Sequence, residues 1–254
     1  MERRYERLPY EQYFLDTSQN YNHTERAVCP LEYETVSYPC RGTLRRLLGL
    51  RHEVDYAFRY DPERDVIQIH FQKTTGFMDW IANFEFAANY YDAISFEDRP
   101  LQLRVHRGWA EMYLAAKRQV RAQWQLLHEA HPTAETEIIG WSLGSGQAIL
   151  CAQDLNYNFG LRSRLITYGS VKPFRARAGE AELLARYLGS VCASCENFAD
   201  HNDIVGYMPP FRGCTDIRRV WVSSRKRSLL RLMQPRRYHT HYDDPALYRE
   251  LPER

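Results

Sequence analysis

The sequence predicts an α/β fold with a mostly parallel central sheet and helices on both faces. Strand-like and helix-like segments alternate along the chain, which is the pattern of parallel strands joined by helices. The run from Gly140 to Gly144 has the form G-x-S-x-G and stands where a β-rich segment gives way to a helical one. The chain has 254 residues, of which 44% are hydrophobic, so it is long enough to bury one core of this kind.

The predicted elements follow in order along the chain. An antiparallel hairpin opens the core, with strands from Val54 to Tyr60 and from Asp65 to Phe71. A strand from Leu101 to His106 precedes a helix from Trp109 to His131, whose apolar residues recur at nearly helical spacing and which ends before Pro132. After the strand and helix around Ser142 we expect, in order, a strand from Leu165 to Tyr168, a helix from Ala181 to Leu188, and strands from Ser194 to Phe198 and from Arg218 to Val222.

No repeat or low-complexity linker divides the chain, so one domain over residues 1–254 is the economical interpretation. Within it, residues 1–50 form an N-terminal extension packed on a core of residues 51–254. The sequence has no apolar run of 18 residues, and its charged N-terminus lacks the apolar core of a secretory signal. We therefore expect a cytoplasmic protein, although export without an N-terminal signal stays open.

Ser142 is the candidate nucleophile. A serine on a sharp strand-to-helix turn is held clear of its own backbone, and small residues on either side let the strand and the helix approach closely. A serine hydroxyl reacts poorly until a base takes its proton, and a histidine oriented by a carboxylate does this.

Around Ser142 the chain resembles the class 3 lipases, a branch of the α/β-hydrolases. In that family an F-R-G-T-like run is followed by D-W-x-x-N, H-x-G-F, a helix, and G-H-S-L-G. The corresponding pieces occur here in the same order, as Phe71-Gln72-Lys73-Thr74, Asp79-Trp80-Ile81-Ala82-Asn83, His106-Arg107-Gly108-Trp109 and Gly140-Trp141-Ser142-Leu143-Gly144. The run from Asp203 to Pro210 resembles the family's D-x-V-x-x-x-P-P, and the resemblance extends over about Phe58 to Tyr248. It implies an α/β-hydrolase fold.

We expect the catalytic base to be a histidine near the C-terminus. In α/β-hydrolases the chain order is serine, then acid, then histidine. Three histidines follow Ser142, and His201 precedes the best candidate acid, Asp203, so that order leaves His239 and His241. The resemblance favours His241, because the proline-containing segment behind it resembles the family's histidine segment. For the acid we expect Asp203, which follows a strand-like stretch, with Asp200 as the fallback.

An oxyanion requires donors that are already aimed at it. One is expected to be the backbone N–H of Leu143, the residue after the nucleophile. The resemblance implies the backbone N–H of Thr74 as the second, with Thr75 as a substitute. The sequence departs from the family here, since Lys73 stands where a glycine is usual and Trp141 where a histidine is usual.

Two further segments bear on lipid contact. The resemblance implies that Phe77 and Trp80 belong to a lid over the acyl pocket, and the alternative is that they are plain core residues. From Arg218 to Arg237 there are eight basic residues and no acidic one, interleaved with apolar side chains. Such a stretch suits peripheral contact with an anionic membrane, and the alternative is a solvated loop. The net charge of +2 and the lack of a known motif argue against nucleic-acid binding.

The six cysteines do not indicate a disulfide scaffold. Cys192 and Cys195 have the spacing of a redox or zinc site, but no second ligand pair is at a suitable distance along the chain, so we expect buried thiols and neither metal nor cofactor.

We expect a serine ester hydrolase of lipase-like type, which cleaves carboxylic esters of lipids or small esters through an acyl-enzyme. The alternatives are a phospholipase for anionic phospholipid, a scaffold protein on a degenerate hydrolase fold, and acyl transfer to an alcohol.

Overall fold

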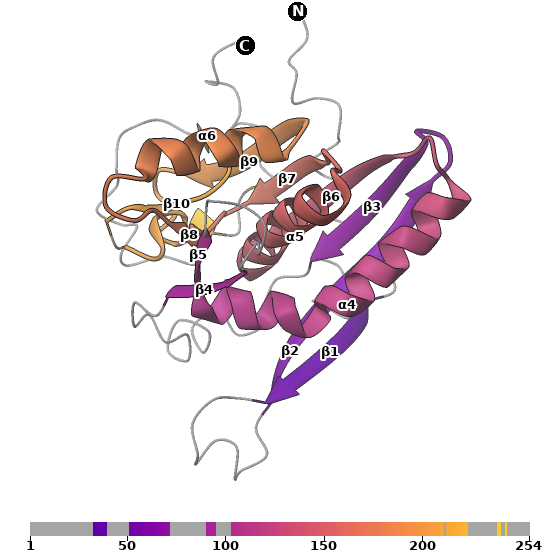
Figure 1. The fold of residues 1–254 in the computed structure, drawn as a ribbon, viewed down its shortest axis with the longest axis horizontal. Coiled ribbons are helices and arrows are strands. Elements are labelled where there is room, and N and C mark those ends of the chain that lie inside the picture. Colours follow the sequence, from indigo (N-terminus) through magenta and orange to yellow (C-terminus); the bar gives the residue numbers. More distant parts are fainter. Residues whose placement is uncertain are drawn as a thin grey trace, which may run out of the picture.

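The computed structural model describes residues 33–39, 51–71, 90–94, 103–210, 212–222, 238–239 and 242. Within these residues the central sheet has seven strands in the order β1-β2-β3-β6-β7-β9-β11. Figure 1 shows this sheet from β1 to β9. From β3 onward neighbouring strands are parallel, so the predicted mostly parallel sheet is confirmed. The strands are β1 (Glu34–Pro39), β2 (Arg51–Asp61), β3 (Val66–Phe71), β6 (Glu135–Trp141), β7 (Arg164–Tyr168), β9 (Ser194–Asp200) and β11 (Arg219–Val222).

Strands β2 and β3 form the antiparallel hairpin that the sequence predicts, with Tyr56 opposite Phe71 and Asp61 opposite Val66. The Asp61 carboxylate accepts backbone N–H bonds within the turn, which is the usual role of an aspartate at this place. Strand β1 comes from the segment assigned to the N-terminal extension. It pairs antiparallel with β2, so this part of the extension completes the sheet.

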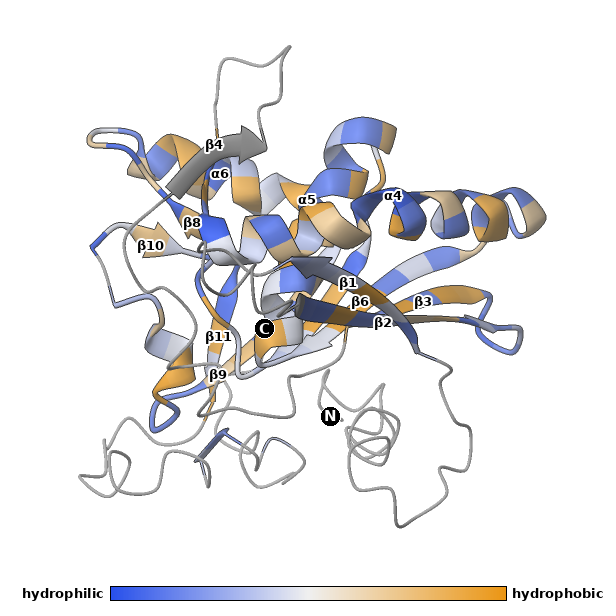
Figure 2. Ribbon diagram, turned by 90° about the horizontal axis from the view of Figure 1, so that it is seen from below, coloured by the Kyte–Doolittle hydropathy of each residue, from blue (hydrophilic) through white to orange (hydrophobic). Residues whose placement is uncertain are grey.

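Among the described residues three α-helices lie on the same side of the central sheet: α4 (Arg107–Ala130), α5 (Leu143–Phe159) and α6 (Ala181–Val191) (Figure 2). The described helices thus cover one face, whereas the sequence predicts helices on both. Helix α5 is buried from Leu143 to Leu155, because it lies between the sheet and its neighbouring helices. A buried carboxylate, Asp154, joins α5 to α4 by accepting hydrogen bonds from Tyr113 (2.8 Å) and Arg121 (2.7 Å). Such a pairing is required for a charge that is removed from water.

A second, smaller antiparallel sheet has the order β10-β8-β5-β4. Its strands are β4 (Tyr90–Ile94), β5 (Leu103–His106), β8 (Phe174–Arg175) and β10 (Cys214–Thr215). The strand predicted before α4 is therefore present as β5, but it does not belong to the central sheet. Strands β8 and β10 have two residues each, too few for a periodic pattern.

The core has two parts because successive residues of a strand point to opposite faces of the sheet. Ile138 and Leu165 belong to the cluster that includes residues of α4 and α5, whereas Ile139 and Ile166 belong to the other cluster. Tyr242, from the C-terminal segment, is fully buried in this second cluster. Tyr242 therefore packs against the central strands.

Cys192 and Cys195 are buried free thiols, as expected. Burial raises the pKa of Cys192 to about 12, so this thiol stays protonated. Among the described residues, no group of His, Cys, Asp and Glu side chains is arranged to hold a metal ion. None of the described helices is both long and apolar enough to cross a membrane.

The buried His106 makes the stability of the fold sensitive to acid. Burial lowers its pKa from 6.5 to about 4. Between these values the unfolded chain takes up a proton that the folded chain does not, so the stabilisation is full above pH 6.5 and is lost as the pH falls toward 4. His106→Asn keeps an acceptor for the Gly108 N–H at the start of α4, yet does not titrate. Thermal unfolding between pH 6.5 and pH 4 should show a smaller loss of stability in this variant than in the wild type. Equal losses would show that His106 is not the source of the acid sensitivity.

Candidate active site

The parallel strands end at one edge of the sheet and bring distant residues together. In the register of the sheet Phe71 lies opposite Gly140, and Trp141 opposite Tyr168. The residues that follow these strands and β9 therefore leave the sheet side by side, and they include Ser142 and Asp203. Ligands of open α/β sheets bind in the crevice outside this edge.

Ser142 has the backbone of a strained turn, with φ 58° and ψ −120°. A positive φ is uncommon for a residue with a side chain and recurs at functional sites. The turn is held by its backbone, since the Ser142 N–H donates to Tyr168 O (2.9 Å) and Ser142 O accepts from the Ser145 N–H (3.0 Å). The Ser142 side chain does not cap α5. This is the strand-to-helix turn that the G-x-S-x-G motif predicts.

The glycines around Ser142 permit close approach of the backbone. A Cβ on Gly140 would lie 2.3 Å from the Gly144 carbonyl oxygen, and one on Gly146 would lie 2.3 Å from Cδ1 of Trp109. Neither distance is possible for a real Cβ. Strand β6 and helices α4 and α5 can therefore come together only with glycine at these positions.

His239 donates from Nδ1 to Oδ2 of Asp203 at 2.8 Å. Both side chains are buried, at 5% and 0% exposure. The other Asp203 oxygen, Oδ1, accepts the Val205 N–H at 2.9 Å, which orients the carboxylate. A proton held on Nδ1 leaves the lone pair of the imidazole on Nε2, and that is the tautomer required of a general base.

Two neighbours place this pair beside Ser142. The Trp141 indole N–H donates to His239 O at 3.2 Å, so the residue next to Ser142 holds the backbone of the histidine. Gly169 follows Tyr168, whose carbonyl accepts the Ser142 N–H, and a Cβ on Gly169 would lie 2.8 Å from His239 Cε1. The departure from the family at Trp141 thus supplies a contact to the histidine.

Tyr242 is a site residue that the sequence reasoning missed. Its hydroxyl donates to Asp203 Oδ2 at 2.8 Å and accepts the Asp200 N–H at 2.8 Å. Burial, together with the charge of Asp203, raises the pKa of Tyr242 well above 10, so the phenol remains a donor. No local pattern marks Tyr242 in the sequence, because it meets Asp203 across 39 positions of the chain.

The predicted acid and base stand as follows. Asp203 contacts a histidine as expected, while the fallback Asp200 accepts the N–H of Asn202 at 2.7 Å, as a turn residue does. His241, the favoured base, lies outside the described residues, and the histidine on Asp203 is the alternative, His239.

The predicted oxyanion donors are described in part. Leu143 is the first residue of α5, so its N–H is among those without an acceptor inside the helix. Thr74 and Thr75 lie outside the described residues, as do Lys73 and the lid candidates Phe77 and Trp80. Their segment begins directly after Phe71, whose register partner is Gly140, two residues before Ser142.

Comparison with known proteins identifies the family of the chain. A family model described as lipase (class 3) matches residues 68–213, a range that contains both Ser142 and Asp203. A lipase of Rhizomucor miehei is 29% identical over 154 residues, which make up 60% of this chain and 39% of that relative. The chain therefore spans only about two fifths of that relative's length.

Solved structures of lipases share the fold. Lipase II from Rhizopus niveus has a TM-score of 0.64 at 19% identity, with 85% of this chain and 80% of that one covered. A triacylglycerol lipase, described as having a serine protease triad as its catalytic centre, has a TM-score of 0.61 at 18% identity, with 85% of this chain and 79% of that one covered. These likenesses show the expected α/β-hydrolase fold. Since the family model covers more than half of the sequence, the chain belongs to the class 3 lipase family.

Proposed function

We propose that this chain is a serine ester hydrolase that cleaves carboxylic esters of lipids through an acyl-enzyme on Ser142. The observation that carries the proposal is the buried hydrogen bond from His239 to Asp203, next to the strained turn of Ser142. Membership of the class 3 lipases supports a lipid ester as the substrate. A triacylglycerol lipase of the same fold uses a serine protease triad, which supports the same roles here.

In the proposed reaction, Nε2 of His239 takes the proton of Ser142 as Oγ attacks the ester carbonyl. The negative charge that develops on the carbonyl oxygen is stabilised by the N–H groups of Leu143 and Thr74. The C–O bond to the alcohol breaks as His239 returns the proton to the leaving oxygen, and an acyl group remains on Ser142. Water, deprotonated by the same histidine, then releases the fatty acid and restores the hydroxyl.

The proposal is tested by incubating the protein with emulsified triacylglycerol, with phospholipid vesicles and with soluble p-nitrophenyl esters. We expect release of fatty acid from triacylglycerol and of p-nitrophenol from the soluble esters. Ser142→Ala should abolish both activities, whereas Ser190→Ala, which changes an exposed serine on α6, should retain them. A folded protein that hydrolyses no ester would overturn the proposal and favour the scaffold alternative. Hydrolysis of phospholipid alone would make it a phospholipase.

We further propose that the segment after Arg219 holds the protein on an anionic lipid surface while Phe77 and Trp80 enter it as a lid. Arg218 and Arg219 are engaged within the protein, because both donate to backbone carbonyls. The other six basic residues of the stretch lie outside the described residues, and Arg225, Lys226 and Arg227 are the densest group among them. A structure of a fungal lipase with an inhibitor has been taken as a model for interfacial activation, which supports a lid.

Replacing Arg225, Lys226 and Arg227 together by alanine should weaken binding to anionic vesicles and slow lipid hydrolysis. Turnover of a soluble ester should be unchanged, because attraction to a membrane contributes about 1 kcal/mol per basic residue and does not act on a neutral ester. Cosedimentation with anionic and neutral vesicles at low and high salt measures the effect, since salt screens it. Equal binding to both vesicle types would contradict the proposal.

A further inference from the structure

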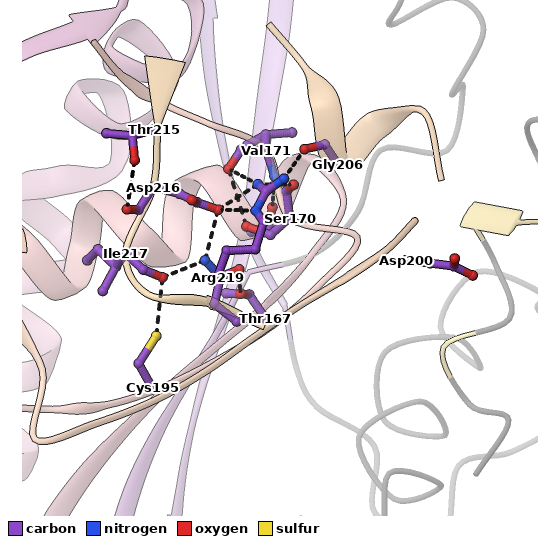
Figure 3. Close-up of polar contacts among 12 residues, drawn as sticks. Thr167, Ser170, Val171, Cys195, Asp200, Gly206, Thr215, Asp216, Ile217 and Arg219 are labelled. Atoms are coloured by element: carbon purple, nitrogen blue, oxygen red, sulfur yellow. Dashed lines mark hydrogen bonds and ion pairs between the residues drawn. The ribbon is translucent and has the colours of Figure 1, made fainter. Parts of the chain in front are cut away.

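Arg219, the first residue of β11, joins two loops at the carboxyl edge of the sheet (Figure 3). Its guanidinium donates to the backbone carbonyls of Ser170 (2.6 Å) and Val171 (3.1 Å), which follow β7. It also donates to the carbonyl of Gly206, in the turn after Asp203. The side chain is 9% exposed, so these hydrogen bonds form largely out of water.

The guanidinium is itself held in a fixed orientation. Asp216 Oδ2 accepts from Arg219 Nε at 2.6 Å and from the Asn197 side-chain amide at 2.9 Å. Asn197 in β9 in turn accepts the hydroxyl of Thr167 in β7 at 2.7 Å. The chain of contacts therefore runs from the central strands to Arg219 (Figure 3). The ring of Trp221 lies 5.2 Å from the guanidinium carbon, a favourable cation–π distance.

The two loops that Arg219 joins carry different parts of the site. The loop after β7 reaches the nucleophile, because the Val171 N–H donates to Ser145 Oγ and Ser145 Oγ donates to Ser142 O. The other loop carries the acid, since the Val205 N–H, next to Gly206, donates to Asp203 Oδ1. One guanidinium thus links the turn of the nucleophile to the turn of the acid.

We propose that Arg219 is a positioning residue, which sets where the Asp203 carboxylate stands relative to the turn of Ser142 and thereby orients His239. A planar fork of five N–H donors can serve three carbonyls and a carboxylate at once, whereas the three donors of a lysine ammonium radiate from one point. The proposal rests on the proposed function for its kinetic effect. The orientation of His239 by Arg219 can be tested without measuring turnover.

The test compares Arg219→Lys with a matched control, Arg164→Lys. Arg164 is similarly buried at 13% exposure and begins β7, but it donates to Glu137 and Glu196 at the opposite edge of the sheet. Both variants should lose stability in thermal unfolding. Only Arg219→Lys should lower kcat for a soluble ester, by roughly tenfold to a hundredfold at unchanged KM, because small misplacements of reacting groups cost about this much. The acid limb of the pH profile of kcat should also shift in Arg219→Lys.

A second readout does not need turnover. The ¹⁵N NMR signals of the His239 imidazole report the hydrogen bond from Nδ1 to Asp203, and we expect them to change in Arg219→Lys and not in Arg164→Lys. Unchanged signals in Arg219→Lys, or equal kinetic losses in the two variants, would overturn the positioning role. If the wild type hydrolyses no ester, but the His239 signals still change in Arg219→Lys and not in Arg164→Lys, the proposed function alone is refuted. If Arg219→Lys does not fold, Asp216→Asn, which removes the charge partner, is expected to give the same contrast.

Discussion

Replacing His239 by alanine is expected to lower kcat/KM for a soluble ester by about 10⁴-fold or more, close to the effect of Ser142→Ala, because members of a triad act as a unit. His239 is the histidine whose Nδ1 lies 2.8 Å from Asp203. Without its imidazole the hydroxyl of Ser142 has no base. The loss should appear in kcat, because a small ester makes little contact with the histidine before reaction.

The matched control is His241→Ala, which changes the neighbouring histidine that the resemblance favoured. His241→Ala should lower kcat/KM for the soluble ester only slightly. Both variants need thermal unfolding curves, because Trp141 donates to the backbone carbonyl of His239 and the nearby Tyr242 packs in the core. The reverse ranking of the two variants at equal folded fraction would move the base to His241.

Asp203→Asn is expected to reduce kcat by about 10⁴-fold while leaving the fold intact. An amide at this position can present its N–H₂ group to the imidazole, which then places the histidine proton on Nε2 and removes the lone pair that the reaction needs. The Asp203 carboxylate is fully buried and accepts from Val205 and Tyr242 as well, so the asparagine should keep part of these contacts.

Asp200→Asn is the control for the acid. Asp200 is equally buried and lies in the same turn, but its Oδ1 accepts the Asn202 N–H. We expect a loss far smaller than in Asp203→Asn, measured as kcat for the same soluble ester. A larger loss in Asp200→Asn would identify it as the acid and return the assignment to the fallback.

The turn of Ser142 could be predicted because its requirements are local. Ser142 has a positive φ between a strand and a helix, and a Cβ on Gly140 would meet Gly144 at 2.3 Å. Both requirements fall within five consecutive residues, so they leave a recognisable pattern in the sequence. The hairpin of β2 and β3 is local in the same sense, since its strands follow one another around a short turn.

The histidine could not be chosen on the same grounds. His239 meets Asp203 across 36 positions of the chain, and no local pattern in the sequence shows which of the two histidines makes this contact. The small sheet that holds β5 also depends on contacts between distant segments. In both cases the sequence predicted the element but not its partner.

Arg219 shows a different limit of sequence reasoning. By composition Arg219 belongs to a stretch that holds eight basic residues and no acidic one, and such stretches are usually solvated. In the structure it is 9% exposed and paired with Asp216. A count of charges does not distinguish a buried arginine that serves backbone carbonyls from one that faces water, because both carry the same charge.

The claim that Ser142 is an activated nucleophile is tested most directly by a fluorophosphonate probe with intact-mass analysis. We expect one adduct on the wild-type protein, none on Ser142→Ala, and strongly slowed labelling of His239→Ala, because the probe reacts with a serine whose proton is taken by a base. An adduct that persists in Ser142→Ala, or no labelling of the folded wild type, would contradict the account.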